Sequence, residues 1–333
     1  MTGNCPSAQV AIVSLRRWTV KLKTGADASL DSLVGPSYTP PVLALQAYFE
    51  PASIDEATDI LRRGSGHFKP FAGGTDVIIN LRRHTANYRA LVNIKGLPGI
   101  TTWVANPGEG LRIGAATPFR ELERSFSVTQ RFKALGEAIR VIGSLQLRNL
   151  ATIGGNLCNA SPAADSAPSL MVCGATVTYV NGGAEKQSLP MEQFFTGPGR
   201  TVLGHDGLLL WVNLPEPPEH SGDCFQRFSP RGALDIGIVS VASRVTLDGA
   251  TGQIQDVAIA LGAVAPTPMR APKAEDSLRG QEPTPDAVAR AGTLARDECS
   301  PIDDIRGSAS YRRVLVEVLV RRTLEQAIQR AKE

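Results

Sequence analysis

The stretch that decides the fold reads ATIGGNLCNASPAADSAPSL and covers residues 151–170. It holds two adjacent glycines, two asparagines and one aspartate, but no histidine, lysine or arginine. A second glycine pair lies upstream in FKPFAGGTDVIINLRR, residues 68–83. In both stretches apolar, strand-like residues run into a polar loop. A glycine pair at such a place lets the backbone approach a ligand closely and turns several N–H groups toward an anion.

Composition and motif content argue against several other functions. The chain has 333 residues, enough for two or three domains, and its formal net charge of +3 is too small to indicate nucleic-acid binding. Its four histidines show no HExxH spacing and it contains no GxSxG elbow, so neither metal-dependent nor serine hydrolysis is indicated. The familiar phosphate motifs also fail, because Lys69 in GSGHFK and Val202 in GPGRTV stand where a Rossmann motif has glycine.

Cysteine usage and hydropathy predict a cytoplasmic protein with reduced thiols and no membrane span. The five cysteines are scattered and form no CxxC pair, which argues against a zinc or iron–sulfur site in this chain. The longest apolar runs, such as VLVEVLV, fall far short of the roughly 20 residues that cross a bilayer. The N-terminus has no basic leader before its short apolar stretch, so no secretory signal is predicted.

Composition also predicts the domain limits. Residues 1–42 are expected to form an N-terminal extension, because they are rich in small residues and proline and show no sustained periodicity. The proline-rich segment LPEPPEHSGD, residues 214–223, is the best boundary further along. We therefore expect one domain over residues 43–222, in two parts of about 43–100 and 101–222, and a C-terminal α+β domain over residues 223–333.

Local patterns predict several elements within these domains. Ser53 and Glu56 form a capping box ahead of an amphipathic helix. Thr117 is expected to be the N-cap of a second helix, with Pro118 in its first turn. The segments IVSVASRVTLD and IQDVAIALGAV are typical of a β-hairpin whose turn lies in DGATGQ. The chain closes with a long helix, and its inward-facing candidates include Val314, Val318 and Leu324.

Three motifs in order carry a specific resemblance. They are FKPFAGGTDVIINLRR, then IGSLQLRNLATIGGNLCNASPAADSAPSL, then FFTGPGRTVL. Together they make residues 45–333 similar to the FAD-binding medium subunit of molybdenum hydroxylases, the xanthine dehydrogenase and carbon monoxide dehydrogenase family. The resemblance implies an α+β fold. It consists of a two-part FAD-binding domain of the vanillyl-alcohol oxidase (PCMH) type, followed by the α+β C-terminal domain typical of these flavin subunits.

By this resemblance two loops form the cofactor site. The first loop comprises Lys69, Pro70, Phe71, Ala72, Gly73, Gly74, Thr75, Asp76 and Val77. The second loop comprises Thr152, Ile153, Gly154, Gly155, Asn156 and Asn159. Residues 73–76 are expected around the pyrophosphate. Inside these motifs we interpret Cys158 as a small buried residue beside the cofactor and Arg148 as a structural anchor of the loop.

Four further positions are implied by the same resemblance. Asp165 is expected to accept hydrogen bonds from the adenosine ribose, and Ile142 to pack near the isoalloxazine ring. Leu203 corresponds to an apolar contact, whereas Gln226 stands where some relatives have lysine. Read from its position alone, Asp165 could instead cap the helix that enters SAPSLM.

The implied function is electron transfer within a larger enzyme. Noncovalently bound FAD carries the redox chemistry, so the protein needs no catalytic acid or base of its own. In the family, a large subunit with molybdopterin hydroxylates an N-heterocycle or aldehyde-type substrate, and a small subunit with [2Fe-2S] clusters relays electrons to the flavin subunit. The flavin subunit then reduces an external acceptor. A heterotrimer or a dimer of heterotrimers is expected.

Two other functions stay open. One is a stand-alone FAD oxidase or dehydrogenase of the vanillyl-alcohol oxidase type. Such enzymes often tether the flavin through histidine, and the TIGGN loop has no histidine in it or beside it. The other is a flavin-fold scaffold without turnover, such as an accessory protein for cofactor insertion.

Overall fold

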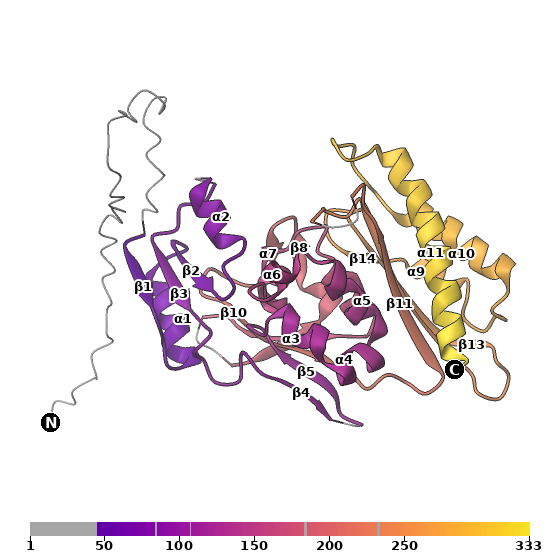
Figure 1. Cartoon of the computed structure of the whole chain (residues 1–333), viewed down its shortest axis with the longest axis horizontal. Helices are drawn as coiled ribbons and strands as arrows, with labels where there is room; N and C mark the ends of the chain where they lie inside the picture. Colours follow the sequence, from indigo (N-terminus) through magenta and orange to yellow (C-terminus); the bar gives the residue numbers. More distant parts are fainter. Residues whose placement is uncertain (1–44, 84, 107, 183–184, 232–233) are drawn as a thin grey trace, which may run out of the picture.

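The computed structural model describes residues 45–83, 85–106, 108–182, 185–231 and 234–333. Over these ranges the chain builds three larger β-sheets in succession, each with its own helices (Figure 1). The predicted α+β class is confirmed. The predicted extension over residues 1–42 lies outside the described residues, and the predicted limits at 43–100, 101–222 and 223–333 remain predictions.

The first sheet is parallel and has the strand order β1-β3-β2. Its elements are β1 (Ala47–Phe49), α1 (Ile54–Arg63), β2 (Phe68–Phe71), α2 (Val77–Arg82) and β3 (Ala90–Asn93). Helix α1 begins where the capping box predicts, since Ser53 Oγ accepts the N–H of Glu56 at 3.1 Å. The Glu56 carboxylate reaches back to the N–H of Ala52 at 2.8 Å. Ala57 and Leu61 then bury one face of the helix.

The second sheet is antiparallel and has the order β4-β5-β10-β6-β7. Its strands are β4 (Trp103–Asn106), β5 (Gly110–Gly114), β6 (Thr176–Val180), β7 (Gln187–Pro190) and β10 (Leu208–Leu214). Six helices lie between β5 and β6 in the sequence: α3 (Phe119–Arg124), α4 (Phe126–Arg131), α5 (Lys133–Val141), α6 (Leu145–Arg148), α7 (Ile153–Asn159) and α8 (Ser166–Val172). A short 3-10 helix, η2 (Met191–Gln193), precedes the ribbon of β8 (Phe195–Gly197) and β9 (Arg200–Thr201).

One predicted helix start in this region is wrong by one residue. The N-cap of α3 is Pro118, which makes no side-chain cap, and not Thr117. Thr117 is fully buried and belongs to the turn that ends β5, where its N–H bonds to the carbonyl of Gly114 at 2.9 Å. Proline provides the fixed φ that a helix entry needs but cannot accept a capping hydrogen bond.

The third sheet is antiparallel with the order β11-β12-β13-β14. Its elements are β11 (Ser221–Phe228), β12 (Val239–Leu247), β13 (Ile254–Gly262), β14 (Met269–Arg270), α9 (Pro272–Asp276), α10 (Pro285–Glu298) and α11 (Ala309–Ala331). The predicted hairpin is confirmed as β12 and β13, which pair from Ser240 opposite Gly262 to Leu247 opposite Ile254. Helix α11 lies along β11 and β12, and α10 packs on α11 (Figure 1).

The inward face of α11 differs from the prediction. Leu324 is buried as expected, but Val314 is 54% exposed and Val318 is only partly buried. The buried face instead consists of residues about one turn apart, among them Leu315, Leu319 and Thr323. Because the helix is apolar on more than one side, periodicity alone does not decide which side faces the sheet.

Two hydrophobic cores result, and polar contacts join them. One core lies under the first two sheets, and the other lies between the third sheet and α9–α11. Asp223 of β11 is buried, and its carboxylate accepts the N–H groups of Lys133 at 3.2 Å and Ala134 at 3.1 Å in the first turn of α5. These N–H groups have no partner within the helix, so the third sheet supplies the cap that α5 lacks. The third sheet therefore also supports α5.

Candidate cofactor-binding site

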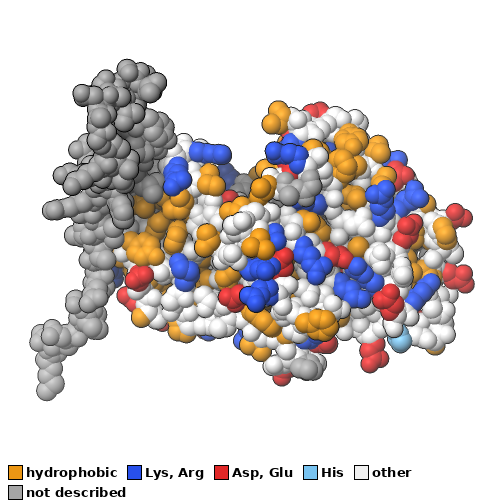
Figure 2. Space-filling view, viewed as in Figure 1, with side chains coloured by type: hydrophobic (Ala, Val, Ile, Leu, Met, Phe, Trp, Pro, Cys, Tyr) orange, Lys and Arg blue, Asp and Glu red, His pale blue; other side chains and the backbone are white. Residues whose placement is uncertain are grey.

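A cavity of about 880 Å³ opens between the first sheet and the helices of the second. That volume lies within the range of small-molecule and cofactor sites. Its walls come from β2 and the loop after it, from the segment that joins α5 to α7, and from the β8–β9 ribbon with the loop that follows it. In the space-filling view the surface is indented between the part that carries α2 and the part that carries α7 and β8 (Figure 2).

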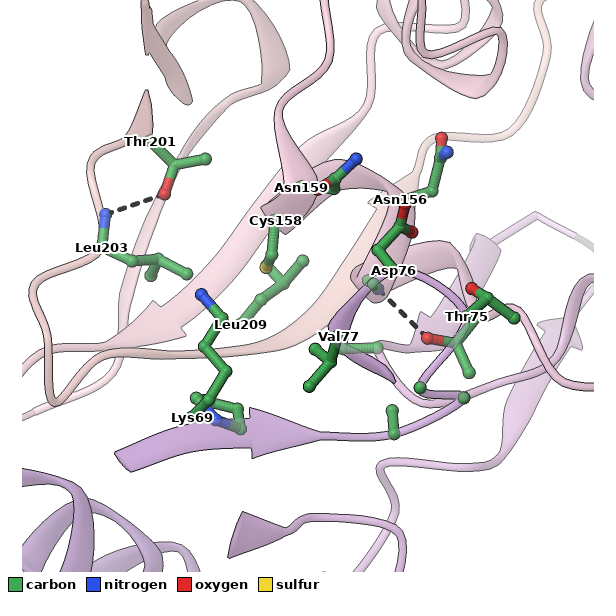
Figure 3. A pocket seen from close by; sticks show the side chains of 18 of the residues that line it. Lys69, Thr75, Asp76, Val77, Asn156, Cys158, Asn159, Thr201, Leu203 and Leu209 are labelled. Atoms are coloured by element: carbon green, nitrogen blue, oxygen red, sulfur yellow. Dashed lines mark hydrogen bonds between the residues drawn. The ribbon is translucent and has the colours of Figure 1, made fainter. Parts of the chain in front are cut away.

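Most of the predicted cofactor residues line this cavity. Those that do are Lys69, Pro70, Ala72, Gly73, Gly74, Thr75, Asp76, Val77, Ile142, Thr152, Gly154, Gly155, Asn156, Asn159 and Leu203. Figure 3 shows Thr75, Asp76 and Asn156 at one end of the view and Thr201 and Leu203 at the other, with Cys158 and Leu209 between them. The structure thus brings together segments that lie more than a hundred residues apart in the sequence.

The first loop, residues 72–77, presents a row of free backbone donors. Residues 73–77 leave β2 and enter α2, and none of their N–H groups donates a hydrogen bond to another described residue. The carbonyls of Gly74 and Asp76 accept the first bonds of α2, from Ile78 at 3.0 Å and Asn80 at 2.9 Å. A run of such donors where a loop enters a helix is a typical anion site.

Glycine is required in this loop for two different reasons. Gly74 has φ +72, a conformation that residues with a side chain rarely adopt. At Gly73 a β-carbon would collide with the carbonyl oxygen of Leu150. The first loop therefore lies directly against the backbone that leads into α7, and the two glycine motifs touch.

The second loop uses its backbone differently. Thr152 is the N-cap of α7, and its hydroxyl accepts the N–H of Gly155 at 3.1 Å. The N–H of Ile153 bonds to the carbonyl of Thr117 at 3.2 Å, and that of Gly154 bonds to the carbonyl of Ala115 at 2.8 Å. Since these donors are already engaged within the protein, this loop offers a ligand close approach and side-chain amides rather than free N–H groups.

Gly155 is the position where the second loop stays open to a ligand. A β-carbon there would meet only the Thr152 hydroxyl oxygen, at 2.9 Å, whereas one at Gly154 would meet the backbone and side chain of Ala115. Gly154 therefore serves the packing of α7 on the end of β5. Gly155 faces the cavity, and any larger side chain there would project into it.

Four predicted site residues lie outside the cavity wall. Ile153 is fully buried in the core, and the Phe71 ring packs edge-on against Tyr48 with centroids 6.2 Å apart. Gln226 is partly buried on β11 and does not reach the cavity. Asp165 lies behind the second loop, next to Ser166, whose hydroxyl donates to an oxygen of the cavity-lining Asn156.

Asp165 is held by an arginine that the sequence reading missed. Its Oδ2 accepts a hydrogen bond from Arg227 Nη1 at 2.6 Å, and both side chains are buried. Its Oδ1 is also buried but has no hydrogen-bond partner among the described residues. Burial raises the pKa of Asp165 to about 6, and Arg227 limits the rise. The helix-cap alternative is wrong, because Asp165 occupies the N-cap position of α8 but its side chain makes no capping hydrogen bond there.

Cations outnumber carboxylates along the cavity. The cations Lys69 and Arg200 line it, together with the imidazole of His205, while Asp76 is the carboxylate in the described part of the wall. Burial raises the pKa of Asp76 above its ordinary value. Arg200 lies inside the quoted motif FFTGPGRTVL but was not selected, and no local pattern marks His205.

Arg148 fits its predicted structural role, whereas Cys158 lines the cavity and is only partly buried. Burial raises the pKa of the Cys158 thiol to about 12, so it is not a nucleophile at neutral pH. Arg148 is buried and pairs with both oxygens of Glu123 at 3.0 and 3.1 Å, and it also donates to the carbonyl of Ile142 at 3.1 Å. It therefore fixes the segment that carries Ile142 into the cavity.

The described residues show neither a metal-binding cluster nor a helix that could span a membrane. Within the described ranges, no cluster of three or more His, Cys, Asp or Glu side chains is placed to hold a metal ion. None of the helices in the described part of the chain combines the length and the apolar character needed to span a membrane.

Comparison with known proteins identifies the family. Residues 43–217 match the family described as the FAD binding domain in molybdopterin dehydrogenase, and residues 225–327 match the CO dehydrogenase flavoprotein C-terminal domain. The xanthine dehydrogenase FAD-binding subunit of Escherichia coli O157:H7 is 31% identical over 85% of this chain and 96% of its own length. The nicotine 6-hydroxylase medium subunit of Paenarthrobacter nicotinovorans is also 31% identical, over 84% of this chain and 96% of its own.

A solved structure agrees with these relatives. The carbon monoxide dehydrogenase from Hydrogenophaga pseudoflava contains a chain that superimposes with a TM-score of 0.81 at 28% identity, over 85% of this chain and 97% of that one. The protein is thus an oxidoreductase subunit with an FAD-binding domain. It belongs to the FAD-binding medium subunits of the xanthine dehydrogenase and carbon monoxide dehydrogenase family of molybdenum hydroxylases.

Proposed function

We propose that FAD binds in the cavity with its pyrophosphate against the first loop. The observation that carries this proposal is the run of backbone N–H groups at residues 73–77, which donate to no other described residue and belong to a cavity wall that also carries Lys69 and Arg200. Two oxyanions of a pyrophosphate would complete those hydrogen bonds. Gly155 fits the same placement, because the cavity beside it is open to a ligand and a side chain at this position would occupy that space.

The remaining contacts follow from this orientation. Asp165 Oδ1 is a buried acceptor without a partner among the described residues, and a ribose hydroxyl would satisfy it. To reach Asp165, the adenosine end has to pass the second loop at Asn156. Ile142 and Leu203 would then bound the isoalloxazine ring as apolar walls. Gln226 makes no contact with the cavity, so we assign it no role beyond the third sheet.

We infer that the subunit transfers electrons and leaves substrate oxidation to its partners. Bound FAD supplies redox chemistry in both one- and two-electron steps. The residues of this chain bind and orient the cofactor and screen it from water. In this role the subunit takes electrons from the [2Fe-2S] clusters of a small partner and reduces an external acceptor. Substrate is hydroxylated at the molybdopterin site of a large partner.

The names of relatives support the expected class of assembly and substrate. Relatives include medium subunits of nicotine 6-hydroxylase and glyceraldehyde dehydrogenase, whose names indicate an N-heterocycle and an aldehyde. We therefore propose a heterotrimer, or a dimer of heterotrimers, that acts on a substrate of one of these two kinds in the cytoplasm. The acceptor that the flavin reduces is NAD, oxygen, a quinone or a protein carrier.

One observation keeps the stand-alone oxidase testable. His205 lines the cavity, although no histidine lies in the second loop. A histidine at the flavin edge could carry a covalent link, which a noncovalent electron-transfer subunit does not need. The two functions differ in whether the isolated chain oxidises substrate.

Replacing Gly155 with valine should abolish FAD retention without unfolding the chain. A branched side chain at this position projects into the cavity, and within the protein it displaces only the Thr152 hydroxyl. Flavin absorbance per mole of purified chain should fall below about a tenth of the wild-type value, the scale expected when a side chain overlaps a ligand. Gly96→Val is the control, since a β-carbon at Gly96 meets nothing within 4 Å. Wild-type flavin content in Gly155→Val would remove the second loop from the site.

The affinity for FAD should depend on pH through Asp165. The pKa of Asp165 is raised to about 6 in the free protein, and the ionised carboxylate is the stronger acceptor for ribose hydroxyls. Kd should therefore fall as pH rises from 5 to 7 and level off above that. Asp165→Asn should bind about 10-fold more weakly at pH 7, in line with losing a hydrogen bond to a charged group, and should lose this dependence.

Isothermal titration at several pH values measures this effect. His205→Gln serves as the control, because it removes the imidazole of the cavity and leaves Asp165 in place. A pH dependence that persists unchanged in Asp165→Asn would show that this carboxylate does not contact the cofactor.

The chain alone should not oxidise substrates of the complex. Loaded with FAD and mixed anaerobically with hypoxanthine, nicotine or an aldehyde, it should keep its flavin absorbance. After co-purification with the iron–sulfur and molybdopterin subunits, the matching substrate should bleach the flavin band. Bleaching by the isolated chain would contradict the electron-transfer role and support the stand-alone oxidase.

A further inference from the structure

An exposed lysine, Lys95, donates a hydrogen bond to the first loop. Lys95 follows β3, and its ammonium turns back to donate to the carbonyl of Ala72 at 3.2 Å and to Asn93 Oδ1 at 2.7 Å. The ammonium also lies 4.7 Å from the centre of the Phe71 ring. Asn93 is held in turn, because its amide donates to Glu50 at 3.0 Å. Lys95 itself does not line the cavity.

The contact with Ala72 fixes the direction of the next N–H group. In a trans peptide the carbonyl of one residue and the N–H of the following residue point to opposite sides. Lys95 holds the Ala72 carbonyl, so the N–H of Gly73 points away from Lys95; Gly73 lines the cavity, whereas Lys95 does not. The adjoining glycines impose little conformational restraint of their own, so the peptide could rotate without this contact.

Two more contacts make the arrangement a bracket, formed by Lys95, Asn93 and Glu50. The N–H of Lys95 also donates to Asn93 Oδ1, at 3.2 Å, so both ends of the lysine are tied to the same amide. Asn93 ends β3, and β3 pairs with β2 directly before the loop, with Phe71 opposite Asn93. The bracket therefore ties the loop to the sheet that carries it.

We propose that Lys95 is a positioning residue for FAD, which orients the donors of the first loop without touching the cofactor. This inference rests on the proposed placement of the pyrophosphate at residues 73–77. It predicts that FAD affinity depends on Lys95 through the phosphate groups of the ligand. Riboflavin, which has no phosphate, does not sense the orientation of the loop.

The test compares Lys95→Met and Lys95→Arg in the full-length apoprotein. Lys95→Met should raise Kd for FAD about 10-fold, chiefly through faster dissociation, because a charge-assisted hydrogen bond that orders the loop is lost. Kd for riboflavin and the melting temperature of the apoprotein should stay at the wild-type values. Lys95→Arg keeps a cationic donor and should restore FAD binding to within about 3-fold.

Ionic strength separates positioning from simple attraction between Lys95 and the phosphates. An attraction through solvent is screened as salt rises toward 0.5 M, whereas an effect on loop geometry is not. The 10-fold ratio between Lys95→Met and wild type should therefore persist at high salt. Lys186→Met is the matched control, because Lys186 also lies over an aromatic ring, that of Trp211, but does not line the cavity or contact the loop.

The outcomes distinguish failure of the proposed FAD site from failure of the proposed role of Lys95. If Lys95→Met binds FAD like wild type while Gly155→Val does not bind it, the cavity site stands and the role of Lys95 is wrong. If the ratio collapses at high salt, or if riboflavin binding weakens equally, Lys95 does not act by orienting the phosphate donors. A large fall in the melting temperature of Lys95→Met apoprotein, without rescue by arginine, would make the residue a general structural one and overturn the inference.

Discussion

The close contact between Gly73 and the carbonyl of Leu150 is the constraint on which the site depends. It brings the loop that leaves a parallel sheet against the backbone that enters α7, next to an antiparallel sheet. No side chain fits between them, so the two motifs can meet only through glycine. Both Gly73 and Ala151, the residue after Leu150, line the cavity, so this contact lies at its wall. A substitution at Gly73 would separate the loops rather than merely fill the cavity.

The two loops divide the work of binding. The first loop leaves its N–H groups free, while the second uses its own N–H groups to fix α7 and presents an open glycine and asparagine side chains. This division explains why two motifs so poor in titratable residues can serve a redox protein. In the proposed placement of FAD, the cofactor carries the chemistry, and the protein contributes backbone donors, a buried acceptor and apolar walls. The ion pair of Asp165 and Arg227 belongs to this support, since the arginine holds the carboxylate in place at the far side of the second loop.

Sequence reasoning succeeded where a property is local and failed where it depends on distant packing. The capping box at Ser53 and the β12–β13 hairpin are local patterns, and both are confirmed. The choice of Val314 as a buried residue is wrong, because the side of α11 that faces the sheet is decided by β11 and β12 and not by the helix itself. Thr117 shows the same limit at a smaller scale, since it belongs to the turn that ends β5 and the helix begins only after it.

For the candidate site, the glycine motifs indicated the residues that line the cavity but not those that hold them. Arg227 binds a carboxylate 62 residues away in the sequence and Lys95 binds a carbonyl 23 residues away, relations that no spacing rule reveals. Asp165 was selected from the motif, yet its pairing with Arg227 and its unpartnered Oδ1 appear only when the third sheet is in place. The motifs therefore indicated the cavity wall, and the tertiary structure identified the residues that hold it in place.

The division of labour between the loops can be measured by amide hydrogen exchange with and without FAD. The N–H groups of residues 73–77 donate to no other described residue, whereas those of residues 153–156 are already engaged. Bound FAD should slow exchange at residues 73–77 by at least about 10-fold, with a much smaller change at residues 153–156 and little effect from riboflavin. Unchanged exchange at residues 73–77 in the FAD-saturated protein would contradict the account, because the pyrophosphate would then lie elsewhere.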